Sequence, residues 1–144
     1  MMLKVKSSKL VLILCSLFLV ALVSCKGEDP FVDPGDVEDP QWKEDSVNNM
    51  TSSMTAIVKI NFQTAQGTLA AFIGDKCCGI GKYVDELCYL YISPATEEGG
   101  NVQLRFYSPS LKRIFVAKET FPYVNDSNLG KVAEPYTPEW VVAK

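Results

Sequence analysis

The residue types that could do chemistry in this chain are limited first by an absence: the 144-residue sequence contains no histidine. Without an imidazole, the chain has no Ser-His-Asp or Cys-His nucleophilic system, no His-Glu-x-x-His zinc site and no histidine general base. Two carboxylate pairs remain, Asp85-Glu86 and Glu97-Glu98. Each pair is adjacent in a turn-like segment, where nothing fixes the carboxyl separation that a glycosidase needs. We therefore expect no enzyme, no cofactor and no metal site.

The cysteines are the other reactive group, and Cys25 has the most informative surroundings. Three lysines at the N-terminus precede an apolar run over residues 10–23, which is the pattern of a secretory signal. The run is too short for a permanent span, which needs about 20 apolar residues. Its end, Leu22-Val23-Ser24-Cys25, resembles the lipobox of bacterial lipoproteins. Residues 1–24 are thus predicted to be removed and the nucleophilic Cys25 thiol to carry lipid, the alternative being an ordinary cleaved signal with a chance cysteine.

The four residues after Cys25 bear on the location of the anchor. Lys26-Gly27-Glu28-Asp29 is similar to the lysine-plus-acid signals that send lipoproteins of Bacteroidetes across the outer membrane. The resemblance implies that Cys25 is held in outer-membrane lipid at the cell surface, with the periplasmic leaflet as the alternative. Two or three acyl chains suffice for stable anchoring, because each buried CH₂ contributes about 0.8 kcal/mol.

Residues 25–45 are predicted to be a lipidated linker rather than part of a fold. Between residues 26 and 45 there are eight acidic side chains, two lysines and three prolines, with no periodic apolar face. Such a segment buries too little apolar surface to fold and should be extended and solvated. A calcium loop over residues 33–39 is a minor alternative, because the acids lack the spacing of an EF-hand loop. Residues 46–144 remain as one domain with a single core.

The charge of that domain argues against a nucleic-acid partner. From residue 46 onward nine basic side chains balance nine acidic ones, and only Lys112 and Arg113 are adjacent cations. Binding to phosphates needs a cluster of Lys and Arg side chains. We expect no nucleic-acid binding.

Alternating hydrophobicity predicts strands and no helix. Residues 54–62 place apolar side chains on one face, namely Ala56, Val58, Ile60 and Phe62. Further strands are predicted over residues 69–83, 87–92, 102–106 and 113–118, and the proline-containing tail over residues 121–140 should supply edge strands and loops. Five to seven short strands predict an all-β fold, a single small antiparallel β-sandwich rather than a barrel.

The turn Asp85-Glu86 sets the predicted register. If these are the two turn residues of a hairpin, Tyr83 faces Cys88, Gly81 faces Leu90 and Gly79 faces Ile92. The next strand is expected to continue this sheet through a pairing of Ile92 with Val102. The inward-facing set of the hairpin is then Leu69, Ala71, Ile73, Cys77, Cys88, Leu90 and Ile92.

Residues 71–80, Ala-Phe-Ile-Gly-Asp-Lys-Cys-Cys-Gly-Ile, resemble a segment of an uncharacterised Ig-like module of secreted Bacteroidetes proteins. The family segment reads Ala-Phe-hydrophobic-Gly-Asp-Glu-Cys-Arg-Gly-Val, and similar residues extend over about residues 53–137. The resemblance implies a β-sandwich in an extracytoplasmic setting and no known activity. This chain departs from it at Lys76, where the family has an acid, and at Cys78, where it has Arg, so any role of that Arg is absent.

Three cysteines remain in the domain, namely Cys77, Cys78 and Cys88. In the predicted register Cys77 and Cys88 share the inward face but lie about six positions apart, roughly 20 Å, which is too far for a disulfide. Both are expected to be buried free thiols. Cys78 is expected to point outward, where it could cross-link two molecules. A zinc site is disfavoured because no Cys-x-x-Cys pair or histidine completes it.

The outward face in this register carries aromatic side chains beside one cation. Tyr89 and Tyr91 on one strand are expected next to Arg105 and Tyr107 on the following strand. Tyr and Arg on a rigid sheet suit stacking on a sugar or a contact with a protein. The alternative is that a second sheet covers this face and makes the tyrosines part of the core rim.

The leading hypothesis from the sequence is a non-catalytic binding or adhesion module at the cell surface, with a glycan or a host protein as ligand. The alternative is a structural or accessory subunit of an envelope or pilus-type assembly. Loss of glycan binding on substitution of Tyr89 and Tyr91 would favour the first, and co-purification of envelope proteins without glycan binding the second.

Overall fold

The computed structural model describes residues 35–45, 52–61, 66–94 and 99–144, all within one compact unit, Pro34–Lys144. The predicted signal, Cys25, residues 26–29, Phe62 and the Glu97-Glu98 pair lie outside the described residues. The described parts form nine strands and include no helix long and apolar enough to cross a membrane.

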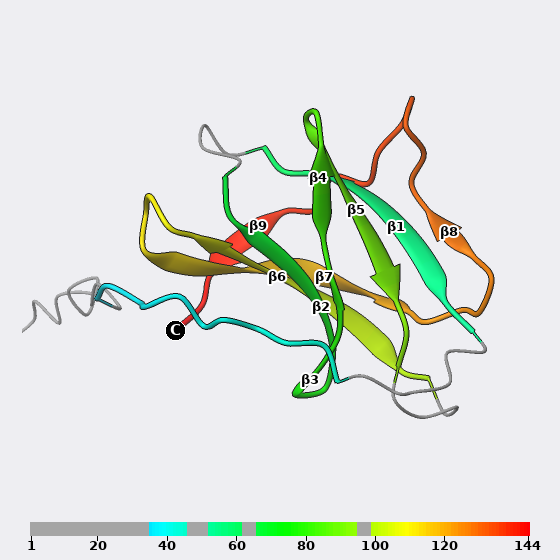
Figure 1. Cartoon of the computed structure of the whole chain (residues 1–144), viewed down its shortest axis with the longest axis horizontal. Coiled ribbons are helices and arrows are strands. Elements are labelled where there is room, and N and C mark those ends of the chain that lie inside the picture. Colours follow the sequence, from blue (N-terminus) through cyan, green and yellow to red (C-terminus); the bar gives the residue numbers. More distant parts are fainter. Residues whose placement is uncertain (1–34, 46–51, 62–65, 95–98) are drawn as a thin grey trace, which may run out of the picture. The chain divides into compact units, whose positions relative to one another are not determined.

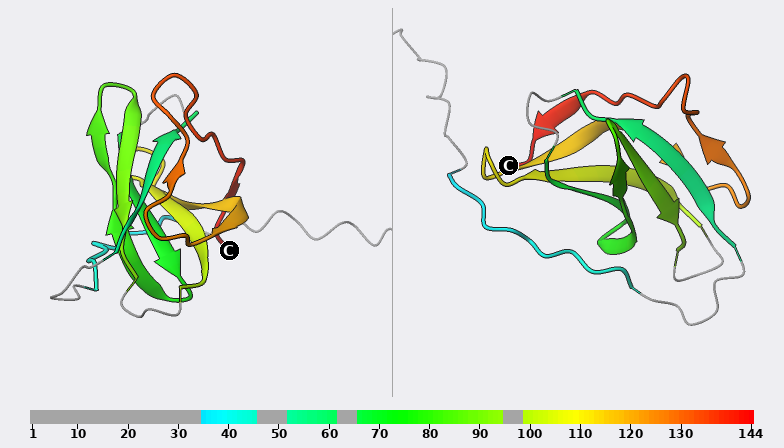
Figure 2. Two further views of the ribbon diagram at one scale, coloured as in Figure 1. Left: turned by 90° about the vertical axis from the view of Figure 1, so that its right-hand side faces the viewer. Right: turned by 45° about the horizontal axis from the view of Figure 1, so that its top comes forward.

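The strands form two sheets. Sheet A has the order β4-β5-β1-β8 and sheet B the order β3-β2-β6-β7-β9, and only β1 and β8 pair in parallel. In Figures 1 and 2 the strands of sheet A run across β6 and β7 of sheet B. The predicted all-β, antiparallel β-sandwich is confirmed. The strands are β1 (Met54–Lys59), β2 (Thr68–Ile73), β3 (Lys76–Ile80), β4 (Lys82–Val84), β5 (Leu87–Ile92), β6 (Asn101–Ser108), β7 (Arg113–Pro122), β8 (Asn128–Leu129) and β9 (Trp140–Val142).

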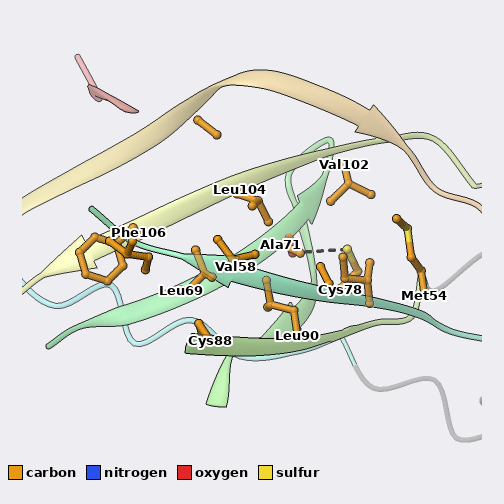
Figure 3. Close-up of a cluster of buried hydrophobic side chains, with 14 residues drawn as sticks. Met54, Val58, Leu69, Ala71, Cys78, Cys88, Leu90, Val102, Leu104 and Phe106 are labelled. Carbon is orange, nitrogen blue, oxygen red and sulfur yellow. Dashed lines mark hydrogen bonds between the residues drawn. The ribbon is translucent and has the colours of Figure 1, made fainter. Parts of the chain in front are cut away.

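The core lies between the sheets and follows the period-two alternation of the strands. In β5, Cys88, Leu90 and Ile92 are fully buried, whereas Leu87, Tyr89 and Tyr91 face outward, as the sequence predicts. Figure 3 shows Cys88 and Leu90 of β5 on the same side as the buried side chains of β2 and β6, and all belong to one cluster. The buried cluster also includes Met54, Ala56, Val58, Leu69, Ala71, Val102, Leu104 and Phe106.

The hairpin around Asp85-Glu86 is confirmed, but only over its inner part. Tyr83 pairs with Cys88, and Asp85 has a positive φ of 55° at the turn. The prediction of one strand over residues 69–83 is wrong. The chain turns tightly between Ile73 and Lys76, so this stretch is divided into β2, β3 and β4.

The chain passes from sheet B to sheet A at Gly81. The Gly81 N–H donates a hydrogen bond to the Leu69 carbonyl in sheet B, and the next residue, Lys82, pairs with Tyr89 in sheet A. A Cβ at position 81 would overlap the Sγ of Cys88, so a larger residue at this crossing would force the Cys88 side chain or the backbone to move. Beyond it the Ser93 N–H still bonds to the Cys78 carbonyl at 2.8 Å, which keeps β3 beside the end of β5.

The predicted pairing of Ile92 with Val102 is wrong. Ile92 pairs with Met54 in sheet A, whereas Val102 pairs with Ile73 and Phe121 in sheet B. Period-two alternation gives every strand an apolar face but does not identify its neighbour, and the two strands bury their apolar faces against each other from opposite sheets.

Residues 35–45, which we call the strap, have no regular secondary structure but are not solvated throughout. The strap is cyan in Figure 1 and runs from the turn between β6 and β7 toward β3. The Val37 N–H donates to the Lys112 carbonyl at 2.9 Å, and the Trp42 ring meets the Phe72 ring edge-on at 5.4 Å. Most residues of this part of 25–45 are exposed and without secondary structure, as predicted for a linker, but Trp42 departs from the prediction because its apolar side chain packs on sheet B.

The strap also occupies the edge of β3. The Asp45 N–H donates to the Cys77 carbonyl at 3.0 Å, and the Glu44 carboxylate accepts from the Ile80 N–H at 2.8 Å. These bonds satisfy backbone groups that an edge strand would otherwise present for pairing with another chain.

Candidate functional site

Tyr89 and Tyr91 lie on the outer face of sheet A. Tyr91 pairs with Thr55 and is 63% exposed. Tyr89 is half-buried and pairs with Ile57 and Lys82. The second sheet packs on the opposite face of β5, so the alternative of tyrosines buried under it is excluded. Tyr91 is therefore available to a ligand.

Arg105 and Tyr107 do not join this face, because β6 belongs to sheet B. Tyr107 is 6% exposed, and its hydroxyl donates to the carbonyl of Val37 in the strap. The Arg105 guanidinium lies 4.2 Å from the centre of the Phe72 ring. The predicted four-residue face is wrong: the structure brings together Tyr89 with Tyr91 and, separately, Arg105 with the residues under the strap.

A pocket of about 380 Å³ opens beside Tyr91. It lies where sheet A, the crossing from β3 to β4 and the strap meet. Its polar residues differ in chemistry: two carboxylates, one ammonium, three serines and the phenol of Tyr91. The lining consists of Glu44, Ser52, Ser53, Ile80, Lys82, Tyr91, Ser93 and Asp126.

Hydrogen bonds fix the walls of the pocket. The Ser93 hydroxyl donates to the Ser52 carbonyl at 2.7 Å, which joins the end of β5 to the segment before β1. The Asp126 N–H donates to the Ser53 carbonyl at 2.9 Å, and Asp126 has a positive φ of 56°. Positive φ is tolerated better by Asp than by most side chains, and here it turns the chain back toward β1.

Glu44 is the pocket residue that comes from furthest away in the sequence. One of its carboxylate oxygens accepts the hydrogen bond from the Ile80 N–H, while Ile80 itself lines the pocket. Lys82 lies two residues beyond Ile80 and across the ladder from Tyr89. The strap and the β3–β4 crossing thus place an acid and a base at the same opening.

The pocket carries net negative charge, because Glu44 and Asp126 outnumber Lys82. In the described part of the chain no group of three or more His, Cys, Asp or Glu side chains is placed to hold a metal ion. Asp36, within the stretch considered as a calcium loop, instead pairs with Lys112, whose hydrogen bond and charge hold the Asp36 pKa below its ordinary value.

The three domain cysteines are buried free thiols, as predicted for Cys77 and Cys88. The predicted shared inward face of these two is wrong, because Cys88 lies in the core between the sheets and Cys77 lies in the cluster under Trp42. The outward placement of Cys78 is wrong. Cys78 is 5% exposed, and its thiol donates to the Ala71 carbonyl at 3.3 Å, shown as a dashed line in Figure 3. A bulge between Ala71 and Phe72 places Cys78 in the core and turns Cys77 to the other face, under Trp42.

Burial makes these thiols poor nucleophiles. Loss of solvent contact raises the pKa of Cys78 and of Cys88 to about 12, and it also raises the pKa of Cys77. The same cause holds the pKa of Tyr83, whose side chain faces Cys88, above its ordinary value. Cys78 therefore does not present a thiolate for cross-linking two molecules.

Among the predicted ligand-contact residues, only Tyr91 lines the pocket. The sequence also contained a signal for a second pocket residue, Lys82. If Tyr83 faces Cys88 in the hairpin, Lys82 must face Tyr89 on the outer surface. Ser52, Ser53 and Asp126 gave no signal, because they reach the pocket through loops whose positions depend on tertiary contacts. Glu44 was assigned to the linker.

Comparison of the chain with models of protein families, with curated proteins and with solved structures finds no match. The residues of the pocket and the N-terminal motifs are therefore the grounds on which a function can be assigned.

Proposed function

We propose that this chain is a lipid-anchored, non-catalytic binding protein of the cell surface that takes a carbohydrate in the pocket beside Tyr91. The observation that carries the proposal is the exposed Tyr91 ring at the wall of a pocket lined by hydroxyl, carboxylate and ammonium groups. An aromatic ring stacks on the apolar face of a sugar, and the polar groups exchange hydrogen bonds with its hydroxyls.

The charge of the pocket narrows the class of sugar. Glu44 and Asp126 accept hydrogen bonds and repel an anion, and Lys82 alone offsets them. Like charges brought together across a binding surface disfavour a partner, so acidic sugars are selected against. The expected ligands are neutral or amino sugars.

The location follows from the N-terminal sequence rather than from the pocket. The apolar run and Cys25 support a lipid anchor, and residues 26–29 support display at the surface. Binding without catalysis agrees with a chain that has no histidine, since the pocket offers no imidazole base.

The test is binding of a charge series of hexasaccharides to the purified chain by calorimetry. The series contains the glucosamine, N-acetylglucosamine, glucose, mannose and galacturonate hexamers. We expect binding of at least one neutral or amino sugar and none of the galacturonate. Replacement of Tyr91 by Ala should weaken binding about tenfold or more, because a central aromatic contact commonly carries this much.

A matched control lies on the same face of the same sheet. Val84 is 56% exposed and does not line the pocket, so Val84→Ala should bind as the unmodified chain does. Tyr89→Ala should weaken binding less than Tyr91→Ala, because Tyr89 adjoins the pocket without lining it. Absence of binding to every sugar, together with co-purifying envelope proteins, would replace this proposal by the structural or accessory subunit.

A further inference from the structure

The strap supplies a pocket residue although most of it docks elsewhere. Glu44 lines the pocket, whereas Trp42 packs on Phe72 and Asp36 binds Lys112, neither at the pocket. We propose that the strap is a working part of the binding site: its docking on sheet B holds Glu44 at the pocket, so that strap docking and ligand binding stabilise each other. This inference rests on the proposed function of the pocket.

The first group of contacts holds the strap at its N-terminal half. The Lys112 ammonium lies 3.1 Å from the Asp36 carboxylate, and the Arg113 guanidinium donates to the Gly35 carbonyl. The Val37 carbonyl accepts a hydrogen bond from the hydroxyl of the buried Tyr107, and the Val37 N–H donates one to the Lys112 carbonyl. These bonds hold strap residues 35–37, which precede Glu44 by several residues, at the turn between β6 and β7.

The second group brackets Glu44 itself. On one side the Trp42 ring covers Phe72, which is buried together with Ala70 and Cys77. On the other side the Asp45 N–H bonds to the Cys77 carbonyl. With Trp42 and Asp45 held on either side, the Glu44 carboxylate reaches the Ile80 N–H at the pocket. Release of Trp42 removes the apolar contact that keeps this part of the strap on sheet B.

Linkage makes the dependence reciprocal. The strap has no secondary structure of its own in the described residues, so its docked state depends on these contacts with sheet B. A ligand that touches Glu44 binds the docked state better than the released state and shifts the population toward docking. By the same coupling free energy, loss of strap docking lowers the affinity for the ligand.

The experiment compares Trp42→Ala with Lys43→Ala in the full chain. Lys43 is exposed on the same strap, and its side chain makes no hydrogen bond or ion pair within the described residues, so it is the matched control. Hydrogen exchange of residues 35–45 measures docking, and exchange of β5 measures whether the fold is intact. Calorimetry with the best-bound hexasaccharide of the charge series measures affinity.

We expect Trp42→Ala to speed hydrogen exchange of the strap about tenfold and to lower the affinity for the sugar about tenfold. Hydrogen exchange of β5 should stay unchanged. Lys43→Ala should change neither quantity. In the unmodified chain a saturating sugar should slow exchange of the strap, and this protection should be lost in Glu44→Ala.

Two results would overturn this inference and leave the proposed function intact. One is a strap that exchanges faster in Trp42→Ala while sugar affinity stays unchanged, and the other is a strap whose exchange does not respond to Trp42→Ala or to the sugar. If the unmodified chain binds no sugar of the series, the proposed function fails and the inference with it, and exchange of the strap still reports whether it docks.

Discussion

Gly81 shows how much of this fold depends on one missing side chain. Its N–H donates a hydrogen bond to the Leu69 carbonyl of sheet B, and the next residue, Lys82, pairs with Tyr89 of sheet A. The space where its Cβ would lie is occupied by the Cys88 thiol, which is fully buried. The two residues therefore share one volume in the core, and a change at either alters the packing of the other.

Gly81→Ala should destabilise the domain by about 1–3 kcal/mol, because it overfills a packed core. Cys88→Ala opens the space, so the double variant Gly81→Ala/Cys88→Ala should lose less stability than the sum of the two single variants. Urea unfolding of the four proteins gives the coupling free energy. Purely additive losses would show that the new Cβ is accommodated without touching Cys88.

At the scale of elements, the strap changes both the surface and the chemistry of sheet B. It covers Phe72 and Cys77 and satisfies the edge of β3 through Asp45 and Glu44. The pKa of Cys77 is raised chiefly by burial and further by the charges of Glu44 and Asp45, all of which depend on the strap. The accessibility of this thiol therefore reports on the element that covers it.

A chain lacking residues 35–45 should react selectively at Cys77. Exposure lowers the Cys77 pKa toward 9.0, the value of an unburied cysteine, so the reactive thiolate becomes more abundant at pH 8. Cys88 stays buried and serves as the internal control. Alkylation followed by peptide mass spectrometry should show Cys77 modified and Cys88 unmodified. Equal protection of Cys77 with and without the strap would contradict this.

At the scale of the whole molecule, the two outer faces differ. The strap packs on the outer face of sheet B, and sheet A presents Tyr91 and the pocket to solvent. The proposed function, a binding protein anchored at a membrane, requires one surface open to the ligand, and the outer face of sheet A around Tyr91 and the pocket is open in this way.

Mass spectrometry of the protein from its native host should find Cys25 as an acylated N-terminal residue. In a Cys25→Ser variant the nucleophile for lipid attachment is lost, so the protein should leave the membrane fraction on cell fractionation. An unmodified Cys25, or an N-terminus elsewhere, would refute the lipid anchor without affecting the pocket.

Local features of the sequence were enough for part of the fold. The Asp85-Glu86 turn and the alternation in residues 87–92 predicted β5 to the residue and the outward position of Tyr91. The strand over residues 113–118 was found but ends four residues later, at Pro122. The site was predicted only through Tyr91, because its other residues come from the strap, from loops and from the β3–β4 crossing.

The sequence by itself determined which face of a strand is apolar and where the Asp85-Glu86 turn must fall, because both depend on neighbouring residues. Tertiary structure alone decided that β5 and β6 lie in opposite sheets, that Cys78 is buried and that Glu44 reaches Tyr91's pocket. The physical reason is that a strand's apolar face packs equally well against several partners in isolation. Only burial of all the faces at once selects one arrangement.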